Sequence, residues 1–139
     1  MSTRTILVVD DDRAVLESYG RLLARLGHRV LLSEDADEVL ADPDSLRDID
    51  LIILDHRMPR RSGLSLLAGL RRRTATEPHP AVILISAFLS DELRDQAARL
   101  GVVEIIEKPV DTKHLLSCVS TVLQGTPDLP RADPRTPRP

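Results

Sequence analysis

The sequence predicts an α/β fold built on a parallel sheet, and three observations indicate it. Short apolar runs of four to six residues alternate along the chain with stretches in which apolar residues recur at helical spacing. The run at residues 51–54 is apolar throughout, as in a central strand that is covered on both faces. Gly27 and Gly101 follow two of the helical stretches, at positions where helices commonly end. We therefore expect five successive strand–helix units.

The first two units lie in the N-terminal third of the chain. The first strand covers residues 5–9, and the helix after it is expected to end at Gly27. The apolar face of this helix is formed by Val15, Tyr19, Leu22 and Leu26. The second strand covers residues 29–33, and a weak second helix covers about residues 36–41.

Three more units complete the predicted sheet. The third strand, residues 51–54, leads into a helix that runs out through residues 71–73. The fourth strand covers residues 81–85, and Ser90 is placed to cap the helix that follows. The fifth strand covers residues 102–106. The helices after these strands have apolar inner faces, formed in turn by Leu64, Leu67 and Leu70, by Leu93, Ala97 and Leu100, and by Leu115, Leu116, Val119 and Leu123.

We expect one domain, residues 3–124, whose last helix is capped by Asp111 or Thr112. Residues 125–139 are rich in proline and arginine and have almost no apolar surface, which predicts a disordered tail. Nothing after residue 124 is long enough for a DNA-binding or enzymatic output domain. We therefore expect the output to pass through another protein.

Composition excludes several classes of protein. The formal net charge of -3 argues against a direct nucleic-acid partner, because nucleic-acid-binding domains usually carry a basic face. No window holds the eighteen or so apolar residues that a membrane span needs, and the N-terminus lacks a signal sequence. Cys118 is the only cysteine, so no internal disulfide can form. A cytoplasmic protein without a membrane partner is expected.

Polar residues follow four of the apolar runs, namely Asp10 with Asp11, Asp55, Ser86 and Lys108. The carboxyl ends of parallel strands meet at one edge of the sheet, where such folds bind ligands. Magnesium suits this edge, because it relieves carboxylate repulsion and accepts one or two carboxylates together with phosphate oxygens. Ser86 and Lys108 can then contact phosphoryl oxygens. Asp55, alone after the most buried strand, is the expected nucleophile and would form an acyl phosphate.

Each of these residues also has a simpler structural interpretation. The aspartates at 10–12 can act only as caps of the following helix. Asp55 can simply end a strand at a turn, Ser86 can be an ordinary strand-end serine, and Lys108 an exposed residue before a proline. The combination of all four sites favours the metal and phosphoryl interpretation.

Four segments of the chain resemble the receiver domain of two-component response regulators. They are residues 6–12, ILVVDDD; residues 50–59, DLIILDHRMP, with Gly63; residues 83–87, ILISA; and residues 108–109, KP. The resemblance spans nearly the whole predicted domain. It implies a flavodoxin-like fold with strand order 2-1-3-4-5 and helices on both faces of the sheet.

The resemblance also implies a mechanism. A sensor histidine kinase or a histidine phosphotransfer protein would pass a phosphoryl group from its phosphohistidine to Asp55, which makes the chain a signalling domain rather than an enzyme. The implied Mg²⁺ ligands are Asp10, Asp11, Asp55 and the backbone carbonyl of Arg57, with Asp10 acting partly through water. Ser86 would swing toward the phosphoryl group and Lys108 would pair with it. A monomer or weak dimer would then signal to a downstream protein or transfer the group onward.

The chain departs from the family pattern in two respects, one at the signalling face and one beside the site. Ile105 stands where an aromatic residue is common, and Val110 replaces the usual phenylalanine, so the aromatic switch is absent. Activation then rests on Ser86 and loop movements, or the face formed by helix 4, strand 5 and helix 5 signals weakly. Phe88 and Arg57 hold places that flank the path of hydrolytic water, and the bulky ring predicts a long-lived phosphorylated form. Alternatively, the ring of Phe88 packs on the fourth helix.

Two other functions stay open. One is a degenerate receiver-like scaffold that binds a partner without being phosphorylated; Ile105 and Val110 favour it, and the intact polar set argues against it. The other is a phosphohydrolase with an aspartyl intermediate. The chain has Arg57 where such an enzyme needs a second acid/base aspartate, and it offers no cap domain.

Overall fold

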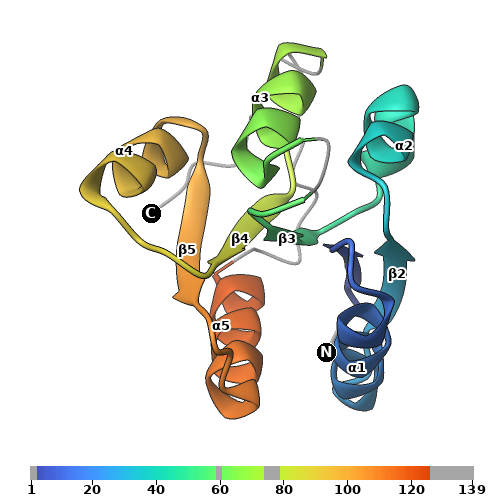
Figure 1. The fold of residues 1–139 in the computed structure, drawn as a ribbon. Coiled ribbons are helices and arrows are strands. Elements are labelled where there is room, and N and C mark those ends of the chain that lie inside the picture. The colour runs from blue at the N-terminus through green and yellow to red at the C-terminus, as the bar shows by residue number, and fades with distance from the viewer. Residues whose placement is uncertain (1–2, 59–60, 74–78, 126–139) are drawn as a thin grey trace.

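Figure 1 shows the computed structural model of the chain, which describes residues 3–58, 61–73 and 79–125. Five parallel strands form a single sheet in the order β2-β1-β3-β4-β5. Helices α1 and α5 cover one face of this sheet, and α2, α3 and α4 cover the other. The predicted fold class and strand order are confirmed.

The element boundaries agree closely with the sequence pattern. The strands are β1 (Thr5–Val9), β2 (Arg29–Ser33), β3 (Leu51–Asp55), β4 (Ala81–Ser86) and β5 (Val102–Glu107). The helices are α1 (Arg13–Arg25), α2 (Ala36–Ala41), α3 (Gly63–Arg73), α4 (Asp91–Arg99) and α5 (Thr112–Gln124), with a short 3-10 helix at Pro43–Leu46 that was not predicted. β3, β4 and β5 each extend one residue beyond the apolar run, so Asp55 and Ser86 are themselves strand residues.

The core lies in two apolar layers, one on each face of the sheet. β3 is buried at all five positions, and its side chains alternate between the layers. Ile52 and Leu54 pack with the apolar side chains of α3, whereas Leu51 and Ile53 pack with those of α1 and α5. This two-sided burial explains why the run at residues 51–54 contains no polar position.

The predicted inner face of α1 was right at Tyr19, but Val15 and Leu22 are only partly buried and Leu26 is exposed. Leu26 lies one residue beyond the helix, and 41% of its surface is exposed. Gly27, with a φ of 90°, follows the C-cap residue Leu26 and turns the chain out of the helix. The buried positions of α1 are instead Leu16, Tyr19 and Leu23.

The predicted helix caps are confirmed. The Ser90 side chain accepts a hydrogen bond from the Leu93 N–H, and Asp111 rather than Thr112 caps α5 through the Lys113 N–H. Gly101 has a φ of 83° at the end of the α4 segment. No helix within the described ranges is long and apolar enough to cross a membrane. The predicted tail falls, apart from Gly125, outside the described residues, so the domain boundary at residue 124 stays a prediction.

Candidate functional site

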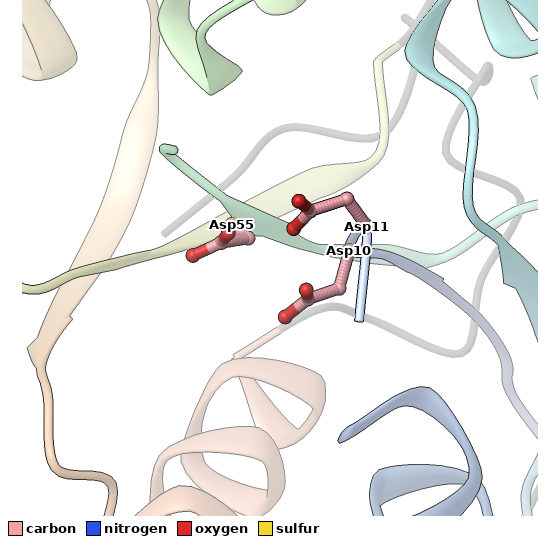
Figure 2. A group of neighbouring side chains, drawn as sticks. All are labelled: Asp10, Asp11 and Asp55. Carbon is pink, nitrogen blue, oxygen red and sulfur yellow. The ribbon is translucent and has the colours of Figure 1, made fainter. Parts of the chain in front are cut away.

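Three carboxylates meet at the carboxyl edge of the sheet. β1 and β3 are parallel neighbours in which Val9 pairs with Leu54, so Asp10 and Asp55 follow this last pair on adjacent strands. Their ligand oxygens and one of Asp11 all lie within 4.8 Å of one another. Figure 2 shows the three side chains projecting into a common space from the ends of the two strands. The predicted convergence of these aspartates is therefore observed.

The three acids differ in their exposure to solvent. Asp10 and Asp55 are only 4% and 3% exposed, whereas Asp11 is exposed. The pKa of Asp10 is raised to about 6, mainly by burial and also by the negative charges of Asp55 and Asp11. The Asp12 N–H, which donates to Asp10 Oδ1 at 2.9 Å, and the charge of Lys108 act in the opposite direction. The cluster thus concentrates negative charge where water cannot fully solvate it.

Asp12 has a different role from its two neighbours. Its Oδ1 accepts hydrogen bonds from the N–H groups of Ala14 and Val15, at 3.0 and 3.3 Å, and so caps α1. The simpler interpretation of the three aspartates is therefore right for Asp12. Asp10 and Asp11 are left to face the space that they share with Asp55.

Lys108 provides the positive charge of the site. It follows β5, and its backbone N–H donates to the carbonyl oxygen of Ser86 at 2.8 Å, which continues the pairing of β5 with β4. Its Nζ lies 2.7 Å from Asp55 Oδ1. The bond from Lys108 to Pro109 is cis. The expected convergence of Lys108 and Asp55 at this edge of the sheet is therefore observed.

Ser86 is buried, but it lies apart from the acids. Its Oγ donates a hydrogen bond to the Phe88 carbonyl at 2.9 Å and accepts one from the Phe88 N–H at 3.2 Å. These bonds close the turn after β4. Within the part of the chain that the structure describes, Ser86 makes no side-chain hydrogen bond to Asp55 or Lys108. Only movement of this turn would bring the hydroxyl to a phosphoryl group on Asp55.

The acids and Lys108 line an open cavity of roughly 770 Å³. Arg57 also lines it, and its side chain is exposed. The remaining lining residues are Asp12, Val15, Tyr19, Met58, Pro109 and Val110. Sequence reasoning placed Tyr19 on the core face of α1 and assigned it no place in the site. The available signal was that Tyr19 is a single polar-tipped residue among the aliphatic residues of that face.

A second cavity of roughly 570 Å³ lies between the loops after β3 and β4, and Ser86 and Phe88 both line it. Phe88 is 76% exposed, so the alternative that its ring packs on α4 is wrong. Arg57 and Met58 line both cavities. Phe88 itself lines only the second cavity, so the hypothesis that its ring hinders hydrolytic water stays a prediction.

The positions that lack the family's aromatic residues are partly buried in the core. Ile105 packs against the apolar layer under α3 and α4, and Val110 packs against the layer under α1 and α5. Neither aliphatic side chain has a polar tip that could report on the site. The expectation that activation rests on Ser86 and loop movements, or that signalling through this face is weak, therefore stays a prediction.

Gly63 brings the start of α3 close to the nucleophile. Its N–H donates to the His56 carbonyl at 2.8 Å, and a Cβ at this position would lie 2.7 Å from the Asp55 carbonyl oxygen. No side chain fits there without moving the backbone that carries Asp55. Pro59, in the same matching segment, lies outside the described residues.

The fold and the acidic edge together define a class of protein: a doubly wound α/β domain with an acidic site at the carboxyl ends of its strands. The family model of the response regulator receiver domain matches residues 6–120. The chain belongs to this family.

Individual relatives agree with this assignment. The DNA-binding transcriptional regulator NtrC of Azospirillum brasilense is 37% identical over 128 residues, which are 90% of this chain and 25% of that protein. The transcriptional regulatory protein CpxR of Escherichia coli K12 is 32% identical over 120 residues, covering 86% of this chain and 49% of that protein. A CheY-like receiver domain protein from Methanospirillum hungatei has a solved structure with 27% identity and a TM-score of 0.77, covering 89% of this chain and 96% of the other.

The match to the curated relatives covers only part of their length. This chain spans about a quarter of NtrC and about half of CpxR. The solved receiver domain, in contrast, is matched over nearly its whole length. What this chain shares with these proteins is therefore the receiver domain.

Proposed function

We propose that this receiver domain accepts a phosphoryl group on Asp55 from the phosphohistidine of a histidine kinase or a histidine phosphotransfer protein. One observation carries the proposal. Asp55 ends a fully buried strand with its carboxylate beside those of Asp10 and Asp11 on one side and Lys108 on the other. Acids and a cation around a single carboxylate are the groups that phosphoryl transfer to oxygen requires.

The residues at this edge fit a magnesium ion. Three carboxylate oxygens within 4.8 Å of one another are hard ligands of the kind that magnesium prefers. Asp10, Asp11, Asp55 and the backbone carbonyl of Arg57 are the proposed ligands. Bound there, Mg²⁺ would neutralise the charge of the acids and of incoming phosphoryl oxygens.

The chain's own groups carry the transfer. A carboxylate oxygen of Asp55 forms the new bond to phosphorus, while the bond from phosphorus to the partner's imidazole nitrogen breaks and that nitrogen keeps the electron pair. Lys108, already 2.7 Å from Asp55, shifts its ammonium group to a phosphoryl oxygen. Water later attacks phosphorus and releases inorganic phosphate, which regenerates Asp55.

Ser86 is the proposed link between the site and the surface. For its hydroxyl to contact a phosphoryl group, it must give up the two hydrogen bonds with Phe88. The turn after β4 then rearranges, and Phe88 moves with it. We infer that this turn, rather than an aromatic pair, distinguishes the phosphorylated form for a downstream protein or a second phosphotransfer partner.

The test is a mass measurement on the intact protein after incubation with Mg²⁺ and acetyl phosphate or a small phosphoramidate. We expect a gain of one phosphoryl group that requires Mg²⁺ and is lost in Asp55→Asn. Asp12→Asn is the matched control, because Asp12 belongs to the helix cap and should leave the gain intact. No gain, or a gain that survives Asp55→Asn, would leave the non-phosphorylated scaffold as the better hypothesis.

A further inference from the structure

Tyr19 is the only tyrosine of the chain, and it lies where α1 faces the sheet. It is 9% exposed and belongs to the apolar layer that α1 and α5 form over the sheet. Its neighbours in that layer are aliphatic, for example Leu16, Leu23 and Leu115. A phenol in such a layer needs a place for its hydroxyl, because burying that group without a hydrogen bond is costly.

The acidic cavity offers a place for this hydroxyl. Tyr19 lines the cavity together with the three aspartates and Lys108. The Tyr19 hydroxyl is not among the buried polar side-chain atoms that lack a hydrogen-bond partner in the described part of the chain. No described residue forms a hydrogen bond with the Tyr19 hydroxyl either, so it must reach solvent. The cavity is the solvent-filled space that this side chain lines.

The electrostatics of the phenol agree with this placement. Its pKa is raised above the usual value, first by burial and then by the negative charges of Asp10 and Asp55. A neutral hydroxyl within the field of two carboxylates can both donate and accept a hydrogen bond. Its ring is held by packing, so the group keeps a fixed direction.

We propose that the Tyr19 hydroxyl is a positioning group of the metal site, which holds a water molecule of the hydration shell of Mg²⁺ bound at the three aspartates. The inference rests on the metal binding that the proposed function contains. Magnesium keeps several of its waters in protein sites, and these waters need hydrogen-bond partners. One oxygen of Asp10 already accepts a hydrogen bond from the Asp12 N–H. A metal-bound water would therefore need another polar group of the cavity as its hydrogen-bond partner.

The first experiment measures Mg²⁺ affinity by calorimetry for the wild type and for Tyr19→Phe, which keeps the ring and removes only the hydroxyl. We expect the variant to bind Mg²⁺ about tenfold more weakly, as losses of groups behind metal ligands usually do. Ser18→Ala is the matched control, because it removes a hydroxyl from the neighbouring position of the same helix, and it should bind like the wild type. Circular dichroism checks that each variant is folded.

The second experiment needs no variant of Tyr19. The chain has one tyrosine and no tryptophan, so its ultraviolet emission comes from Tyr19 alone. Adding Mg²⁺ should change this emission with the same midpoint that calorimetry gives. The change should be absent in Asp11→Asn, where an exposed ligand is removed and the phenol is untouched.

The outcomes separate the two proposals. If the wild type does not bind Mg²⁺, the proposed function fails together with this inference. If the wild type binds Mg²⁺ and Tyr19→Phe binds it equally well, only the role of Tyr19 is overturned, and the side chain is a core residue with a solvated tip. Weaker binding in Tyr19→Phe together with a Mg²⁺-dependent emission change supports the inference.

Discussion

Lys108 Nζ lies 2.7 Å from Asp55 Oδ1, and the carboxylate of this pair is almost fully buried. The two residues come from strands that are not neighbours, since β4 lies between β3 and β5. The lysine therefore reaches across the end of β4 to pair with Asp55. A phosphoryl group on Asp55 would place its oxygens where the ammonium group now meets the carboxylate, so the same lysine serves both forms of the site.

The first prediction concerns this ion pair. Lys108→Met should lower the rate of phosphorylation at least tenfold, because the transferred group loses a cation that faces it. It should also destabilise the fold by about 1 to 2 kcal/mol, less than for a fully buried pair, because the lysine side chain is 36% exposed. Chemical denaturation gives the stability, and the mass assay gives the rate.

A double-mutant cycle separates the pair from other effects of the lysine. In an Asp55→Asn background, Lys108→Met should cost much less stability than in the wild type. Equal costs in the two backgrounds would mean that the ion pair contributes nothing to the fold.

The second prediction follows from the raised pKa of Asp10, about 6 against 3.8 for an ordinary aspartate. A carboxyl with a higher pKa in the folded protein holds its proton more tightly when folded, so its contribution to stability is greatest below pH 4 and is lost as the pH rises to about 6. Without Mg²⁺, Asp10→Asn should therefore be more stable than the wild type at pH 7.5, by about 2 to 3 kcal/mol.

Denaturant titrations at several pH values check this prediction. The advantage of Asp10→Asn should shrink between pH 6 and pH 4 and vanish below pH 4. Saturating Mg²⁺ at pH 7.5 should stabilise the wild type more than the variant, because the metal compensates the charge that Asp10 carries. An advantage that is the same at pH 4 and pH 7.5 would rule out ionisation of Asp10 as its cause.

The third prediction concerns Gly63. Gly63→Ala places a Cβ 2.7 Å from the Asp55 carbonyl oxygen, so the backbone under the nucleophile must shift. We expect a loss of about 2 kcal/mol or more in the free energy of unfolding, together with slower phosphorylation. Thermal unfolding and the mass assay measure the two effects.

Gly20→Ala is the control for this substitution. Gly20 lies inside α1, and its added Cβ would meet Leu32 at the ordinary distance of 3.5 Å. Alanine is favoured over glycine within helices, so this variant should gain up to about 1 kcal/mol. A similar loss in both variants would show that the close approach at Gly63 is not the cause.

The fourth prediction concerns the lifetime of the phosphorylated form. Phe88 is 76% exposed and lines the cavity beside Ser86 and Arg57, so its ring can obstruct the approach of water without contributing to the core. Phe88→Ala should speed the loss of the phosphoryl group several-fold and leave the melting temperature unchanged. Val103→Ala, at another exposed apolar position, is the control. Equal decay of the phosphorylated mass in Phe88→Ala and the wild type would refute the role of the ring.

Much of the site was predictable because it lies at strand ends. Apolar runs with a polar residue after them locate both a strand and the side chain at its carboxyl end, as for Asp55 and Ser86. The helix caps were also predictable, since Ser90 and Asp111 act on N–H groups two or three residues away. Leu26 was misplaced because spacing alone does not say where the chain leaves the helix.

Residue order alone determined which groups this protein brings to one edge: an α/β chain with parallel strands, three aspartates, a serine and a lysine. Only the tertiary structure decided which of them touch. Lys108 contacts Asp55, Ser86 bonds instead to Phe88, Asp12 caps the helix, and Tyr19 lines the same cavity as the acids. The physical reason is that strand periodicity and caps are local properties of the chain, whereas contacts between side chains depend on register, packing and burial across segments far apart in sequence.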